Sequence, residues 1–312
     1  MIRTSGVRRG FSRPGVLRLD GTIGAIRSND RTGASAAHRF HDVRMNTPGR
    51  APLSVAALLL AVALLPIGCG TSGPPKCSTA SNAAPCTRVL FVGNSYTYVN
   101  DLPTTFADLA VSGGRNVEAG MVASGGETLA QHAVARETLD KIASASWTFV
   151  VLQEQSETPT SSAGRSSMMY PAARTLAARV KAAGAQTMFF MTWAHRDGMA
   201  VAGAGTYESM QLAIDDGYIS IADELRAAIA PVGFTWFVVR REHPEISMWQ
   251  DDGSHPTASG TYLAACVFYA AIFRQSPEGL AYFDGLSSQD ARVLQAAAAS
   301  SVLQNPDQWG LR

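Results

Sequence analysis

Residues 88–98 read RVLFVGNSYTY. Residues 89–92 are all apolar, the run ends at Gly93, and the polar Asn94 and Ser95 follow at once. A short apolar run with no polar side is typical of a strand that is buried on both faces of a parallel sheet. By itself, Ser95 is equally well explained as a turn or helix-capping serine, so the rest of the chain has to decide its role.

The same pattern recurs along the chain, with helical segments between the apolar runs. Because long helical periods alternate with short runs rich in β-forming residues, we expect consecutive βα units. The sequence therefore predicts a doubly wound α/β/α sandwich with a central five-stranded parallel sheet. The expected strands are residues 88–93, 116–123, 147–153, 185–194 and 233–240, and the expected helices are residues 102–113, 127–144, 167–184, 207–231, 258–275 and 287–304.

Residues that begin and end helices support these assignments. Pro103 lies in a first helical turn directly after Asp101, and Gly184 stands where the third helix should end. Ser287 or Ser288 can cap the last helix.

The charge balance excludes one class of partner. The chain has 312 residues, 46% of them hydrophobic, and a formal net charge of +1. Ten arginines and three acids lie in residues 1–68, which leaves 16 basic and 22 acidic residues in residues 69–312. This acidic body has no Lys/Arg cluster interleaved with aromatic residues, so we expect no nucleic-acid partner.

Residues 45–69 are typical of a signal peptide. Residues 55–67 form an apolar stretch that is too short to span a bilayer as a helix and long enough for a signal-peptide core. Gly68 and Cys69 then resemble a bacterial lipobox, with Pro66 where that motif prefers Leu. We expect a lipid at Cys69 to be the only attachment to a membrane, which would leave the protein facing the periplasm or the cell surface. Secretion after cleavage nearby is the alternative, and both predict an exported protein.

Residues 1–44 are rich in Arg, Ser and Gly and have no apolar periodicity, so we expect them to be disordered. A segment of this kind would block an N-terminal signal. We therefore interpret it as the product of a start site placed too far upstream, with Met45 as the true start; a transit peptide is the alternative.

Residues 70–86 are rich in Gly, Pro and Ser and predict a flexible linker before a folded domain of residues 87–312. Cys77 and Cys86 lie in this linker and are candidates for a local disulfide in an exported protein. Cys266 lies in an apolar helical segment, where we expect it to be buried. The sequence gives no reason to expect a metal or an organic cofactor.

Ligands of such sheets bind beyond the carboxyl ends of the strands, which is where Ser95 lies. A serine is a weak nucleophile unless a base removes its proton and a third group orients that base. Residues 251–256, DDGSHP, supply both groups. We expect Asp252 to hold one imidazole nitrogen of His255 and the other nitrogen to face Ser95.

Together these stretches resemble the SGNH (GDSL-like) hydrolases. The first block of that family, a nucleophilic serine in a Gly-Asp/Asn-Ser context after the first strand, matches residues 93–95. The last block, Asp-x-x-His before the final helix, matches residues 252–255. The resemblance covers roughly residues 88–275. It implies a flavodoxin-like fold and an ester hydrolase in which Ser95 is the nucleophile, His255 the base and Asp252 its orienting acid.

The resemblance also implies an oxyanion hole, formed by the backbone N–H groups of Ser95 and of a glycine after the second strand. Gly126 is the better match for that glycine and Gly125 the alternative. The third block of the family, Gly-x-Asn-Asp, is replaced here by residues 153–156, QEQS. Aligning the blocks puts Gln155 at the Asn position, where its amide could be a further donor on a longer arm.

Three residues near these blocks are candidates for substrate contacts. They are Gly125, His195 after the fourth strand, and Trp249 just before the Asp/His block. For His195 the alternative is a solvated loop in which Arg196 pairs with Asp197. For Trp249 the alternative is a place in the core.

The sequence thus favours an exported serine esterase, with O-acetyl groups on carbohydrates as the favoured substrate and a small acyl ester or a lysophospholipid as the next. The α/β-hydrolase fold is disfavoured, because Thr97 stands where its Gly-x-Ser-x-Gly motif requires glycine. A surface carbohydrate-binding protein that kept the fold and lost turnover is the alternative from another class. Its only support is the altered third block.

Overall fold

The computed structural model describes residues 76–78, 84–201 and 203–311, so the predictions for residues 1–44, for the signal peptide and for Cys69 lie outside the described residues. Five strands form one parallel sheet in the order β2-β1-β3-β4-β5, which confirms the expected fold class. The order reverses between β1 and β3, and open α/β sheets bind ligands at such a point. The strands are β1 (Thr87–Gly93), β2 (Val117–Ala123), β3 (Phe149–Leu152), β4 (Gln186–Phe190) and β5 (Ala228–Ala230).

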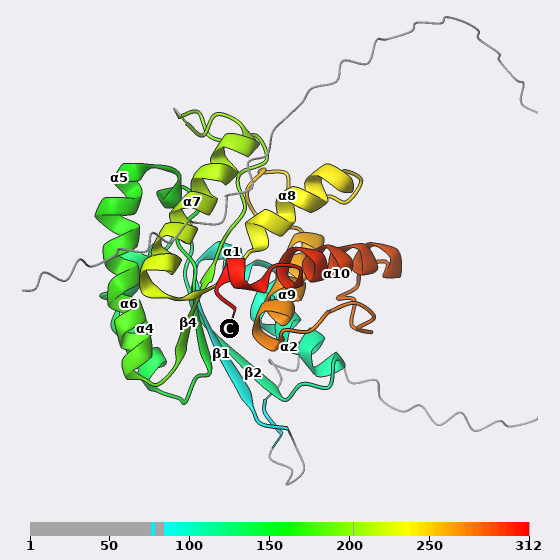
Figure 1. Cartoon of the computed structure of the whole chain (residues 1–312), viewed down its shortest axis with the longest axis horizontal. Helices are drawn as coiled ribbons and strands as arrows, with labels where there is room; N and C mark the ends of the chain where they lie inside the picture. The colour runs from blue at the N-terminus through cyan, green and yellow to red at the C-terminus, as the bar shows by residue number, and fades with distance from the viewer. Residues whose placement is uncertain (1–75, 79–83, 202, 312) are drawn as a thin grey trace, which may run out of the picture. The chain divides into compact units, whose positions relative to one another are not determined.

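Helices cover both faces of the sheet (Figure 1). One layer contains α2 (Leu102–Ser112), α9 (Ala258–Phe273) and α10 (Ser288–Leu303), and the other contains α4 (Arg136–Ala143), α6 (Tyr170–Ala182) and α7 (Tyr207–Leu225). The remaining elements are α1 (Ser95–Tyr98), η1 (Val99–Asp101), α3 (Leu129–His132), η2 (Thr158–Thr160), α5 (Ser162–Gly164), η3 (Arg165–Met169), α8 (Val232–Glu242) and η4 (Pro306–Trp309).

The opening stretch forms β1 at the centre of the core. Residues 89–92 are fully buried because β1 has a strand on each side and a helix layer on each face. The ring of Phe91 meets Phe106 of α2 and Phe268 of α9 edge to face, with centroid distances of 5.8 and 5.1 Å. This geometry is favourable for aromatic pairs, so the apolar run of β1 fixes the helix layer that contains α2 and α9.

The fifth strand is not where the sequence analysis placed it. The predicted strand at residues 233–240 is helix α8, and β5 lies inside the predicted helix at residues 207–231. Periodicity cannot separate a short apolar strand from a buried helix segment, and that ambiguity caused the error. In α8 the buried side chains of Val232, Trp236 and Val239 recur at helical spacing on one face. The prediction of residues 233–240 as a strand was therefore wrong, although the number of strands was right.

The predicted helix ends are otherwise confirmed. The Asp101 carboxylate accepts a hydrogen bond from the Thr104 N–H at the start of α2, and Pro103 lies in the first turn. Ser287 caps α10, and Gly184 follows α6 with a φ of +79°. The single helix expected at residues 127–144 is instead two helices, α3 and α4.

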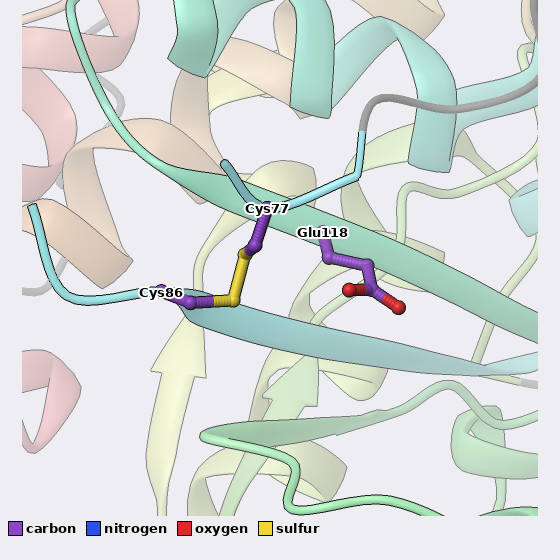
Figure 2. Close-up of side chains that lie close together, drawn as sticks. All are labelled: Cys77, Cys86 and Glu118. Carbon is purple, nitrogen blue, oxygen red and sulfur yellow. A yellow bond between two sulfur atoms is a disulfide. The ribbon is translucent and has the colours of Figure 1, made fainter. Parts of the chain in front are cut away.

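The described residues before β1 are attached to the domain. Cys77 and Cys86 form the expected disulfide (Figure 2). The N–H of Ser78 donates to Asn116 Oδ1 at 2.7 Å, and Asn116 Nδ2 donates to the carbonyl oxygen of Ala84 at 2.7 Å. Because Asn116 precedes β2, this attachment lies at the edge where the strands begin.

Glu118 lies beside the disulfide, as Figure 2 shows. With Cys77 and Cys86 it is the one group in the described part of the chain whose spacing could suit a metal. Both sulfurs belong to the disulfide, so no thiolate is available as a ligand. Cys266 is buried, as predicted. No helix among the described residues is long and apolar enough to cross a membrane.

Candidate active site

The turn after β1 holds Ser95 at the carboxyl edge of the sheet. Asn94 caps α1 with its side chain, and Ser95 is the first residue of that one-turn helix. A Cβ atom on Gly93 would lie 2.3 Å from Gln153 Oε1 and 2.5 Å from Thr97 Oγ1. Glycine is therefore required here, because any side chain would push the loop after β3 away from Ser95.

The structure brings the three predicted catalytic residues into one hydrogen-bonded line. His255 Nε2 lies 2.9 Å from Ser95 Oγ, and His255 Nδ1 lies 2.5 Å from Asp252 Oδ2. A carboxylate at Nδ1 places the proton on that nitrogen, so Nε2 can accept the hydroxyl proton of Ser95. The side chain of His255 is 34% exposed, and Ser95 is half-buried. The Asp252 side chain is 47% exposed, so the line lies at the surface of the protein and Ser95 is accessible to a substrate.

The local backbone keeps Asp252 ionised. Its Oδ1 accepts the N–H groups of Ser254 and His255, each at 2.9 Å. The hydrogen bond from the His255 side chain, together with these backbone bonds, lowers the pKa of Asp252 to about 2. The carboxylate therefore stays charged at any pH at which the imidazole could act as a base.

Two aromatic residues hold the His255 loop against the nucleophile turn. The buried ring of Tyr96 stacks on Trp193 with centroids 4.4 Å apart, and its hydroxyl lies 2.7 Å from Ser254 Oγ. The indole N–H of Trp193 donates to the Ser254 carbonyl at 3.0 Å. Burial raises the pKa of Tyr96 to about 12. This contact was not predicted, because Tyr96 lies outside the Gly-Asn-Ser block and Ser254, 158 residues away, occupies a variable position of the Asp-x-x-His block.

The loop after β2 contains the two candidate oxyanion glycines. Its turn is closed by a hydrogen bond of 3.1 Å from the Glu127 N–H to the Ser124 carbonyl, and Gly126 adopts a φ of +69° that favours glycine. A Cβ on Gly125 would lie 3.3 Å from the Tyr98 hydroxyl. Asn94 Nδ2 donates to the Glu127 carbonyl at 3.0 Å, so this loop is joined directly to the nucleophile turn.

The loop after β3 contains two glutamines with different partners. Gln155 Oε1 accepts the N–H groups of Glu157 and Thr158 at 2.9 and 3.1 Å, which leaves its NH₂ group with one long contact of 3.4 Å to Ser156. Gln153, for which no role was predicted, accepts the Asn94 backbone N–H at 2.8 Å and donates to Asn94 Oδ1 at 2.9 Å. Gln155 thus has a donor to offer, and Gln153 holds the turn that presents Ser95.

Comparisons with known proteins bear on the fold and the family. No family model and no curated protein matches the chain. A solved structure assigned to the SGNH hydrolases, from Slackia heliotrinireducens, is 29% identical, with a TM-score of 0.51 over 59% of this chain and 98% of that one. The chain is an SGNH (GDSL-like) hydrolase. A DUF4886 family protein from Bacteroides uniformis shares the fold, at 18% identity and a TM-score of 0.61 over 72% of this chain and 96% of that one. The family makes this chain an esterase-type hydrolase.

Glu154 of this SGNH hydrolase is fully buried behind the site. Its Oε1 accepts the Gln155 N–H at 2.7 Å and the Leu129 N–H at 3.1 Å. Its Oε2 is buried and has no hydrogen-bond partner. Burial raises the pKa of Glu154 to about 7, and the two backbone N–H groups partly offset this shift. The sequence analysis gave Glu154 no role, because its partners belong to a loop that only the fold brings near.

The other two residues predicted to contact substrate, His195 and Trp249, make contacts within the protein. His195 is half-buried, its Nε2 lies 3.2 Å from Ser156 Oγ, and burial lowers its pKa. Arg196 pairs with Asp197 at 3.3 Å, which is the alternative stated for this loop. Trp249 packs in the core, and its indole N–H donates to the Ala194 carbonyl at 3.1 Å, so its polar atom is already occupied.

An open groove with a volume of about 580 Å³ lies at the opposite edge of the sheet from the hydrolase site. It is lined by the starts of β3, β4 and β5 and by Lys181, Arg226 and Arg274. Arg226 and Arg274 are the C-cap residues of α7 and α9, where a cation stabilises the negative end of a helix. A structural role explains these charges, so the groove is not the candidate site.

Proposed function

We propose that the protein is an exported serine esterase that removes O-acetyl groups from carbohydrates. Ser95 Oγ attacks the ester carbonyl while His255 Nε2 takes its proton, and Asp252 stabilises the imidazolium. His255 then gives the proton to the departing sugar hydroxyl, which leaves an acetyl group on Ser95. A water molecule, deprotonated by His255, attacks this acyl-enzyme and releases acetate and free Ser95.

The observation that carries the proposal is the unbroken line of hydrogen bonds from Ser95 through His255 to Asp252. A binding protein has no use for an acceptor nitrogen at 2.9 Å from a serine hydroxyl. The backbone N–H groups of Ser95 and Gly126 and the NH₂ group of Gln155 are the proposed donors to the oxyanion.

Two features support a bulky alcohol, such as a sugar, as the leaving group. The side chains of His255 and Asp252 are 34% and 47% exposed, so the site is open to a large leaving group. Tyr98 is 39% exposed, lies one helical turn after Ser95, and has its hydroxyl beside Gly125. Residues three apart on a helix share a face, so this ring can stack on a sugar next to the nucleophile. A small acyl ester or a lysophospholipid is the next candidate substrate.

The disulfide before β1 supports the proposed export of the protein. The disulfide between Cys77 and Cys86 persists only in an oxidising compartment, which agrees with export. A lipid on Cys69 would then be the anchor.

Labelling with a fluorophosphonate probe tests the proposed function. We expect the wild-type protein to be labelled and Ser95→Ala to be unlabelled. Ser144→Ala is the matched control, because the Ser144 hydroxyl only bonds the Lys141 carbonyl at the end of α4, and it should label like the wild type. A folded wild type that takes up no label would favour the carbohydrate-binding alternative. Release of acetate from acetylated xylan, compared with hydrolysis of long-chain esters, then tests the substrate class.

A further inference from the structure

Three loops at the carboxyl edge contain the proposed nucleophile and oxyanion donors. We call them loop 1 (residues 93–95), loop 2 (residues 124–128) and loop 3 (residues 153–156). Loop 1 presents Ser95, loop 2 contains Gly126 and loop 3 contains Gln155. A misplacement of about 1 Å in such donors can cost about 100-fold in rate, so the spacing between the loops matters for catalysis.

Asn94 joins loop 1 to both of the other loops. Its backbone N–H and its side chain pair with the amide of Gln153 in loop 3, and its Nδ2 bonds the Glu127 carbonyl in loop 2. Both polar atoms of the Asn94 side chain therefore have a hydrogen-bond partner. Through Asn94, loops 2 and 3 are each bonded to loop 1, but these hydrogen bonds do not run directly from loop 2 to loop 3.

Glu154 supplies that missing link. One oxygen, Oε1, accepts the N–H of Gln155 in loop 3 and the N–H of Leu129, the residue directly after loop 2. The backbone N–H of Glu154 donates to the hydroxyl of Tyr218 in α7 at 3.0 Å. The carboxyl group is buried and its Oε2 has no partner. Burying a carboxyl group is costly unless hydrogen bonds compensate, and the two bonds that Oε1 accepts from the loops are the ones its side chain makes.

We propose that Glu154 is a positioning residue that sets the separation of the Gly126 and Gln155 donors. This inference rests on the proposed function, because it assigns Glu154 to the same oxyanion hole. Removing the carboxyl group leaves two buried N–H groups without an acceptor, and the ends of loops 2 and 3 must then separate or admit water. Ser95, His255 and Asp252 do not contact Glu154, so the nucleophile should stay competent.

Hydrolysis of p-nitrophenyl acetate by variants of Glu154 tests whether this residue positions the oxyanion donors. For Glu154→Ala we expect kcat to fall about 10- to 100-fold with KM changed by less than about threefold, since the lost interaction acts in the transition state. Glu154→Gln keeps a carbonyl acceptor at Oε1 and should retain kcat within about threefold of the wild type. Asp108→Ala is the control: this acid on α2 also has a pKa raised by burial but lies outside the three loops, and its kcat should not change.

Wild-type kcat in a folded Glu154→Ala protein would overturn the proposal, as would a Gln variant as slow as the Ala variant. If alanine prevents folding, Glu154→Met fills the volume without an acceptor and should show the same fall in kcat. Amide hydrogen exchange gives an independent measurement: peptides covering residues 124–129 and 153–156 should exchange faster in Glu154→Ala than in the wild type. An inactive, unlabelled wild type would contradict the proposed function, whereas unchanged exchange in the variant would contradict the role of Glu154.

Discussion

Gly93 controls how closely the third loop approaches the nucleophile. For Gly93→Ala we expect a loss of about 1–3 kcal/mol in the free energy of unfolding, because the new methyl group overlaps Gln153 Oε1 and Thr97 Oγ1. We also expect a lower kcat, since relief of the overlap moves the turn that holds Ser95. Urea unfolding and ester hydrolysis measure the two effects.

Gly205→Ala is the control for this change, because a Cβ there meets nothing within 4 Å and the residue has no left-handed backbone. Its stability should be unchanged or slightly increased. Equal effects of the two substitutions would show that the approach at Gly93 does not matter.

The carboxyl group of Asp252 does not change its charge near neutral pH. Its pKa is lowered to about 2 in the folded protein, so its contribution to stability and catalysis is present above the unfolded pKa of 3.8 and is lost only as the pH falls toward 2. A fall of kcat/KM between about pH 7 and pH 4 therefore does not come from Asp252, and we expect such a fall because the base must be unprotonated to accept the Ser95 proton. Glu154, whose pKa is raised to about 7, is separated from this effect by repeating the profile with Glu154→Gln. A flat profile down to about pH 4 would contradict the role of His255 as base.

Replacing Asp252 tests the orienting role directly. For Asp252→Asn we expect kcat to fall about 10²- to 10⁴-fold, because an amide can hold the imidazole in the wrong tautomer and cannot stabilise its charged form. Asp251→Asn removes an exposed neighbouring carboxylate that makes no contact with His255, and kcat should stay near the wild-type value. Steady-state kinetics of the two variants distinguish a specific carboxylate from general acidity of the loop.

Individual elements show what the sequence could and could not predict. The strand ending at Gly93 and the Asp/His turn were predictable, because each is a local pattern whose place at the sheet edge follows from the βα alternation. The triad geometry therefore followed from two short motifs. The exchange of β5 for α8 was not predictable, since a strand of three residues has too few side chains to show a period.

The residues that join the loops were also beyond sequence reasoning. Gln153 and Glu154 adjoin the aligned Gln155, yet their partners, Asn94 and Leu129, are 59 and 25 residues away. Tyr96 and Trp193 also contact partners that are far away in the sequence. Such contacts depend on which loops the strand order places together, and no local pattern encodes that order. The composition held the only signal: two amides and a carboxylate, residues 153–155, directly follow an apolar strand whose surroundings should exclude water.

The disulfide and the candidate active site lie at opposite edges of the sheet. The disulfide and Asn116 hold the segment before β1 at the edge where the strands begin, and Ser95 lies at the edge where they end. Since no hydrogen bond among the described residues links the two cysteines to the three loops, the disulfide and the site should respond independently.

Removing the disulfide tests that independence. For the double variant Cys77→Ala and Cys86→Ala we expect kcat on p-nitrophenyl acetate to stay within about twofold of the wild type, because the cross-link lies far from the reacting atoms. Opening so short a loop should cost at most about 2–3 kcal/mol of unfolding free energy. Reductant should destabilise the wild type by the same amount and leave the double variant unchanged, as measured by urea unfolding with and without dithiothreitol. A large fall in kcat would show instead that the amino-terminal edge is coupled to the site through β1.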